Sequence, residues 1–161
     1  MTAGVENPAG FALRPPERDP AAPFGIYLHV PFCSTRCGYC DFNTYTAGEL
    51  GSATSPVDWE RAAAIEIDKA AEVLARSGTP PRVDTVFVGG GTPSLVGADV
   101  LVGLLERIDS AFGLAPGAEV TTESNPESTS PEFFARLREG GYTRISLGMQ
   151  STSARVLKIL D

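Results

Sequence analysis

The chain is poor in the residues that usually build metal, redox and membrane sites. Only three of its 161 residues are cysteine, one is histidine and one is tryptophan. No apolar run is long enough to span a bilayer, and the net charge of −7 argues against a nucleic-acid partner. Residues 1–6 lack the basic start and the apolar segment of a secretory signal. We therefore expect a cytoplasmic protein that keeps its thiols reduced, with no membrane span and no nucleic-acid partner.

The three cysteines, Cys33, Cys37 and Cys40, form one C-x3-C-x2-C motif. A disulfide would leave one thiol unpaired and close a strained short loop, so a disulfide scaffold is not expected. A structural zinc site usually has four Cys or His ligands, and His29 is the only histidine. Three thiolates suit a [4Fe-4S] cluster, which would keep one iron open to a small molecule. The spacing favours the cluster over zinc, with redox sensing or a chance arrangement as the remaining alternatives.

Residues 1–23 differ from the rest of the chain. They hold five prolines among charged residues and no periodic apolar pattern, which predicts a disordered or loosely attached arm. From residue 24 onward, segments typical of strands and of helices alternate. The expected strands are 25–30, 83–88, 119–124 and 143–147, and the expected helices are 56–77, 98–112, 131–139 and one from about 153. This repeated β-α unit predicts a parallel sheet that is covered by helices.

Such units build either an open doubly wound sheet or a (β/α) barrel. The position of four unusual segments favours the barrel, because each begins at the carboxyl end of an expected strand, where barrels place their active sites. These segments are the cysteine motif, 89–93 (GGGTP), 123–126 (ESNP) and 148–151 (GMQS). The chain stops inside an apolar-periodic helix without a capping signal, so we expect a fragment. The predicted fold is α/β: a partial TIM-type (β/α) barrel, about the first four β-α units, over residues 24–161.

Single residues at this rim have ordinary structural explanations beside functional ones. The glycine triplet suits a tight strand-to-helix turn, but it would also let bare backbone approach a ligand. Glu123 is more often a solvated carboxylate than a ligand contact, and His29 more often a hydrogen-bonded core residue than a metal ligand. The Tyr39 ring either shields the cysteine motif from solvent or contacts a cofactor. Strand alternation places two polar sets on the prospective interior face: Tyr27 with His29, and Ser146 with Gly148 and Gln150.

Four motifs in order carry a family resemblance: YxHVPFCxxxCxYC at 27–40, GGGTP at 89–93, ESNP at 123–126 and RISLGMQ at 144–150. Together they resemble the radical S-adenosylmethionine (SAM) enzymes, and within them the branch related to oxygen-independent coproporphyrinogen oxidases. The resemblance implies that Cys33, Cys37 and Cys40 hold a [4Fe-4S] cluster whose fourth iron binds the methionyl part of SAM. It also implies further SAM contacts from Tyr27, Tyr39, Gly90, Gly91, Thr92, Glu123 and Gln150. No catalytic residue is assigned.

The residue two places after the third cysteine separates two groups within this branch. The oxidases have a pattern that resembles C-x3-C-x2-C-x-C, whereas this chain has Phe42 in place of the further cysteine. That difference is typical of the HemW-type haem chaperones, so we expect haem handling rather than oxidative decarboxylation of a porphyrinogen. The implied partners are haem or a porphyrinogen, haem-accepting proteins, and a low-potential electron donor such as flavodoxin or ferredoxin. Haem would be held through a part of the protein that lies outside this chain.

Overall fold

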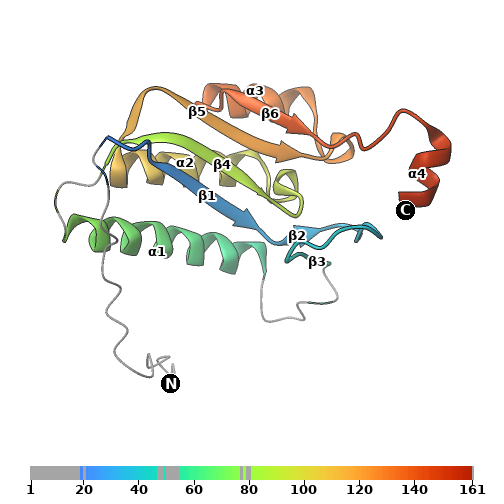
Figure 1. Ribbon diagram of the computed structural model, residues 1–161, viewed down its shortest axis with the longest axis horizontal. Coiled ribbons are helices and arrows are strands. Elements are labelled where there is room, and N and C mark those ends of the chain that lie inside the picture. Colours follow the sequence, from blue (N-terminus) through green and yellow to red (C-terminus); the bar gives the residue numbers. More distant parts are fainter. Residues whose placement is uncertain are drawn as a thin grey trace.

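The computed structural model describes residues 19, 21–46, 49, 55–76, 78 and 81–160. Its main sheet has four strands that are all parallel and lie in the order of the sequence (Figure 1). They are β1 (Gly25–Val30), β4 (Val83–Gly90), β5 (Leu114–Ser124) and β6 (Arg144–Leu147). A doubly wound sheet reverses its strand order at a switch point, and these four strands show no reversal. The arrangement is that of successive strands in a (β/α) barrel, as predicted.

Helices connect the strands and lie behind the sheet in the view of Figure 1. They are α1 (Pro56–Ala75), α2 (Ala98–Phe112) and α3 (Pro131–Glu139), with short 3-10 turns η2 (Pro93–Val96) and η3 (Pro126–Ser128). A final helix, α4 (Ala154–Leu160), follows β6 and lies apart from the sheet (Figure 1). The expected helix starts are confirmed. The Ser55 hydroxyl accepts the Asp58 N–H at 3.1 Å in a full capping box, and the Ser130 hydroxyl accepts the Phe133 N–H at 3.2 Å.

The core lies between the sheet and these helices. Each strand sends alternate side chains to this side, so that Val30, Val86, Val88 and Val120 are at most 1% exposed. From α2, Leu101 and Ile108 are fully buried in the same cluster. The aliphatic stripe of α2 that the sequence contains therefore faces the sheet. The other face of the sheet is free of helices among the described residues.

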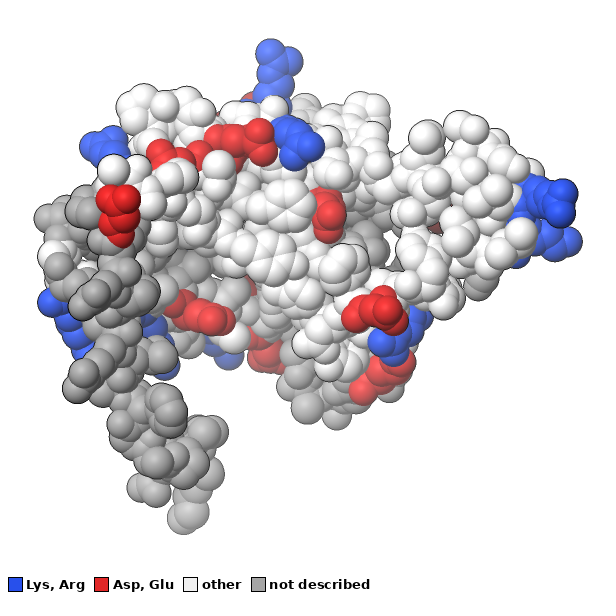
Figure 2. All heavy atoms as spheres, in the orientation of Figure 1, with Lys and Arg blue, Asp and Glu red and all other residues white. Residues whose placement is uncertain are grey.

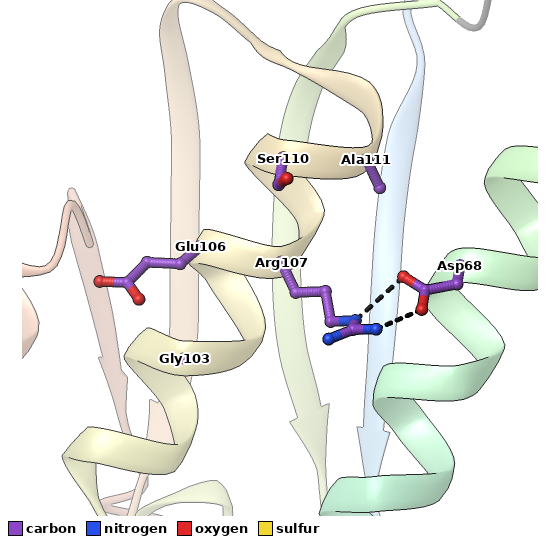
Figure 3. A pocket seen from close by; sticks show the side chains of 6 residues that line it. All are labelled: Asp68, Gly103, Glu106, Arg107, Ser110 and Ala111. Atoms are coloured by element: carbon purple, nitrogen blue, oxygen red, sulfur yellow. Dashed lines mark hydrogen bonds and ion pairs between the residues drawn. The ribbon is translucent and has the colours of Figure 1, made fainter.

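Ion pairs join neighbouring helices along the outside of the molecule. Arg107 of α2 makes a two-point contact with Asp68 of α1, in which Nε donates to Oδ1 at 2.9 Å (Figure 3). Arg136 of α3 donates from Nε to Asp99 Oδ1 of α2 at 2.7 Å. A groove of about 450 Å³ beside the Asp68–Arg107 pair is lined mainly by polar residues of both helices. It lies on the helical side, away from the carboxyl ends of the strands.

Some boundaries differ from the expected ones. Strand β5 begins at Leu114 rather than at 119, because Leu114 pairs with Val83 before the register shifts and the intervening residues leave the ladder. Pro116 has no N–H to donate and Gly117 has φ +79°, which together favour this bulge. A second, two-stranded sheet pairs β2 (Phe32–Cys33) with β3 (Tyr45–Thr46) and was not expected.

The predicted N-terminal arm falls almost wholly outside the described residues. Within the part of the chain that is described, no helix is both long and apolar enough to cross a membrane.

Candidate metal and cofactor site

The open face of the sheet carries a row of functional side chains near the carboxyl ends of the strands. The parallel register places His29, Gly89, Glu123 and Ser146 side by side on four neighbouring strands. Two residues earlier on β1 and β4, Tyr27 stacks on Phe87 with ring centroids 6.1 Å apart, and Tyr27 remains 56% exposed. Seen from this side, the surface over the strands carries few charged groups (Figure 2). The predicted polar face of β1 is therefore real and accessible.

The cysteine motif lies in a loop that is fixed at its base and exposed at its tip. We call residues Phe32–Thr46 the cysteine loop. The pairing of β2 with β3 closes its base, where the Tyr45 N–H donates to the Pro31 carbonyl at 2.7 Å. Cys33 and Cys40 are partly buried, whereas Cys37 is exposed, and all three thiols are free. The thiols are thus available at one end of the barrel strands.

The three cysteines raise the question of which metal group they could hold. Among the described residues, no three Cys, His, Asp or Glu side chains converge closely enough to hold one metal ion. A single zinc ion needs its ligands at one centre, whereas a cubane binds each thiolate at a different iron and keeps the sulfurs further apart. The choice between zinc and a cluster therefore rests on the cysteine spacing, which favours the cluster.

His29 is held by hydrogen bonds on both ring nitrogens. Its Nε2 lies 2.8 Å from the Asn43 carbonyl, which can only accept, so Nε2 carries the proton. Nδ1 then accepts from the Tyr27 hydroxyl at 2.9 Å. This chain of hydrogen bonds links strand β1 to the far end of the cysteine loop. The only histidine is therefore a structural tether, and it has no nitrogen left for a fourth zinc ligand.

Trp59, near the start of α1, supports the same loop from behind. Its indole N–H donates to the His29 carbonyl at 3.1 Å, and its ring meets Phe32 edge-on with centroids 6.0 Å apart. Sequence reasoning did not single out this residue. The available signal was that the only tryptophan of the chain lies one turn inside a capped helix that follows the cysteine motif.

The glycine loop, Gly89–Val96, packs directly against the cysteine loop. The Gly91 N–H donates to the Val30 carbonyl and the Thr92 N–H to the Phe32 carbonyl, both at 2.7 Å. A Cβ on Gly91 would lie 2.4 Å from the Phe32 carbonyl oxygen and 3.0 Å from Cys33 Sγ. Gly90 has φ +116°, and a Cβ there would lie 2.6 Å from the His29 ring. The triplet is thus needed for close backbone approach beside Cys33, beyond what a simple turn requires.

Glu123, at the end of β5, is half-buried rather than freely solvated. Its Oε2 accepts the Gly90 N–H at 3.1 Å, so a carboxylate joins the glycine loop from the neighbouring strand. Burial and the Glu123 charge together raise the pKa of Tyr27, which lies on the same face. The structure therefore brings together Tyr27, Glu123, the glycine loop and Cys33.

The last two predicted contacts lie at the edge of this group. Tyr39 is 47% exposed in the cysteine loop, where burial and the neighbouring Cys37 and Cys40 thiols raise its pKa. Gln150 follows the end of β6 in a left-handed conformation with φ +59°. The expectation that strand alternation continues to Gln150 was wrong, because the strand ends at Leu147. The turn brings the Gln150 amide nitrogen to 3.6 Å from the Cβ position of Gly148.

Comparison with known proteins identifies the family to which these motifs belong. The family model of the radical SAM superfamily matches residues 27–161. The chain is 59% identical over 88% of its length to the heme chaperone HemW of Mycobacterium tuberculosis H37Rv, of which it covers 35%. It is 35% identical over 86% of its length to HemW of Escherichia coli K12, and covers 35% of that protein. The chain thus spans about a third of the length of the curated relatives it matches.

A solved structure has the same arrangement of elements. Coproporphyrinogen III oxidase (HemN) of Escherichia coli, described as a radical SAM enzyme, superposes with a TM-score of 0.74 at 25% identity. The superposition covers 89% of this chain and 31% of the oxidase. Together with the strand order, it confirms the predicted partial barrel of the radical SAM type.

Proposed function

The chain belongs to the radical SAM superfamily, and we propose that it is part of the cofactor-binding core of a HemW-type haem chaperone. The observation that carries this proposal is the 59% identity, over 88% of the chain, to a protein named as a heme chaperone. Phe42 supports it, because the chain has an exposed phenylalanine at the position of the further cysteine in the oxidase pattern. The whole protein would bind haem and transfer it to haem-dependent proteins.

Cys33, Cys37 and Cys40 would hold a [4Fe-4S] cluster. When bound, such a cluster supplies an electron at low potential and an open iron for SAM. The chain's own part is to hold three thiolates on a loop whose base is fixed by Trp59 and by the β2–β3 pairing. A low-potential donor such as flavodoxin or ferredoxin would deliver the electron, and three free thiols suit the reducing cytoplasm.

SAM would occupy the open face between the cysteine loop and Glu123. The glycine triplet lies beside Cys33, and the Glu123 carboxylate is joined to it through the Gly90 N–H. The apolar faces of Tyr27 and Phe87 would support an uncharged part of the ligand. The proposed contacts are Tyr27, Tyr39, Gly90, Gly91, Thr92, Glu123 and Gln150.

A second candidate function is oxidative decarboxylation of coproporphyrinogen III. The observation that favours it is the structural likeness to the oxidase at a TM-score of 0.74. Phe42 argues against it, because the oxidase pattern has a further cysteine at this position. Both candidates use the same cluster and SAM site, so they differ in the substrate and not in the part of the fold that this chain contains.

The metal ligands are tested by iron and sulfide analysis of the full-length protein after anaerobic reconstitution. We expect about four irons per chain. Replacing Cys37 by Ala should abolish the characteristic visible absorption, whereas Thr35→Ala, an exposed neighbour in the same loop, should leave it unchanged. Stoichiometric zinc without sulfide in the wild-type protein would refute the cluster.

The two functions are separated by supplying each substrate to the reconstituted full-length protein. We expect haem to bind in a spectroscopic titration and to pass to an apo-haem protein. With SAM, a reductant and coproporphyrinogen III, we expect no vinyl-bearing product. Formation of that product, with no haem binding, would refute the chaperone function and support the oxidase function.

A further inference from the structure

Ser94 connects two loops that the proposed function assigns to SAM, although no motif of the sequence singles it out. It lies in η2, near the end of the glycine loop, and only 5% of it is exposed. Its hydroxyl makes hydrogen bonds to Asn125 and Ser128. Both lie in residues 123–130, the end of β5 and the turn that follows it, which we call the β5 loop. A buried hydroxyl that reaches across to another loop is a tie between them.

The hydrogen bonds form a closed ring. The Asn125 N–H donates to Ser94 Oγ at 3.1 Å, and the two hydroxyls of Ser94 and Ser128 lie 2.6 Å apart. The Ser128 hydroxyl donates to the Asn125 carbonyl at 3.1 Å. Because its hydrogen is used there, Ser94 must be the donor between the two serines. Every hydrogen in the ring therefore has an acceptor, and each member depends on the others.

The ring lies close to the proposed SAM contacts on both loops. Ser94 follows Thr92 by two residues, and Asn125 follows Glu123 by two residues. On the open face the same loops meet a second time, where the Gly90 N–H donates to Glu123 Oε2 at 3.1 Å. Two ties at separate points prevent one loop from turning relative to the other, which a single tie would allow.

We propose that Ser94 is a positioning residue: through its ring with Asn125 and Ser128 it holds Gly90–Thr92 and Glu123 in one fixed arrangement for SAM. The proposal rests on the proposed function of these loops. It predicts that the loss of the Ser94 hydroxyl loosens both loops together, and that SAM then binds more weakly while the cluster is still formed. Ser94 itself touches neither cofactor.

The first test needs no cofactor. Hydrogen exchange is followed in the full-length protein without SAM, in peptides that cover residues 89–96 and 123–128. We expect Ser94→Ala to raise exchange about tenfold in both segments, since a buried N–H and a buried hydroxyl lose their partner. Ser130→Ala is the matched control, because it removes the cap of α3 but no member of the ring. It should raise exchange at the start of α3 only.

The second test measures the Kd for SAM of the reconstituted full-length protein by anaerobic calorimetry. We expect Ser94→Ala to raise the Kd about tenfold with unchanged iron content, and Ser130→Ala to change it less than about twofold. Ser128→Ala should raise it about threefold, and the double variant no more than Ser94→Ala alone, because both residues belong to one ring.

The outcomes separate this inference from the proposed function. Faster exchange in the glycine loop alone, or an unchanged Kd in Ser94→Ala, would overturn the positioning role. An equal rise of the Kd in Ser130→Ala would also overturn it, since general destabilisation would then explain the effect. If the wild-type protein binds no SAM, the proposed function fails, and the exchange in both loops alone decides whether Ser94 couples them.

Discussion

The two faces of the main sheet are built from alternate residues of the same strands, yet they are entirely different environments. Toward the helices, Val30, Val86 and Val88 are at most 1% exposed and pack within the apolar core. Toward the open side, Tyr27, His29 and Glu123 keep polar groups that are joined by hydrogen bonds or exposed. One face therefore stabilises the fold while the other carries the chemistry, and each can be changed without the other.

The largest effect is expected from the helix-covered face. Leu101→Ala would remove a fully buried side chain of α2 and leave a cavity against the sheet, which should cost about 3 kcal/mol of unfolding free energy. Urea unfolding of the full-length protein measures it. The iron content of the folded fraction should not change. Tyr27→Phe on the open face is the control, and should cost less than about 1 kcal/mol. Equal losses from both variants would show that the two faces are not independent.

The glycine loop, which begins at the carboxyl end of β4, contributes both to stability and to the proposed SAM site. A substitution there should reduce both stability and SAM binding. In Gly91→Ala the new methyl would lie 2.4 Å from a backbone oxygen, so one of the two loops must move. We expect a loss of about 2 kcal/mol and of measurable SAM binding. Gly103→Ala is the matched control: it lies in α2, where a Cβ would meet nothing within 4 Å, and should stabilise by about 0.5–1 kcal/mol. Unchanged SAM affinity in Gly91→Ala would contradict the inference that the glycine loop must lie close to Cys33 for SAM to bind.

Substitution of Trp59 tests whether helix α1 stabilises the cysteine loop. Trp59→Phe keeps an aromatic ring against Phe32 but removes the hydrogen bond to the His29 carbonyl, which should cost about 1 kcal/mol. Slower reconstitution of the cluster should accompany this loss, because the base of the cysteine loop loses a fixed point. Thermal unfolding by circular dichroism and iron uptake measure the two effects. Val57→Ala, at an exposed site of the same helix, should change neither.

The smallest effect is expected on the outer surface, at the pair of Asp68 and Arg107 (Figure 3). The hydrogen bonds and charge of Arg107 hold the pKa of Asp68 below its usual value. The stability that this pair contributes is therefore present above the ordinary aspartate pKa and is lost as the pH falls through the lowered one. Asp68→Asn should lower the urea midpoint slightly at neutral pH, and this difference should shrink as the pH falls below about 4. Ser110→Ala in the same groove removes no charge and should change the midpoint equally in both pH ranges.

Much of the fold was predictable because its signals are local. The capping serines Ser55 and Ser130 and the apolar period of α2 mark the helices, and the structure confirms those starts. Strand β5 was placed too late, because Pro116 and Gly117 indicate a loop and only the pairing of Leu114 with Val83 adds the earlier residue. The β2–β3 sheet was missed, since two-residue strands have no periodicity to detect.

Local sequence was sufficient to identify the chemistry: three thiols at C-x3-C-x2-C spacing, the motifs at the strand ends, and Phe42 in place of a fourth cysteine. These are covalent facts about neighbouring residues, so spacing alone reveals them. Only the folded chain shows how distant residues meet: His29 has no free ring nitrogen, Gly91 lies against Cys33, and Ser94 joins Asn125. These contacts depend on strand register and loop path, which are fixed by packing across the whole sheet.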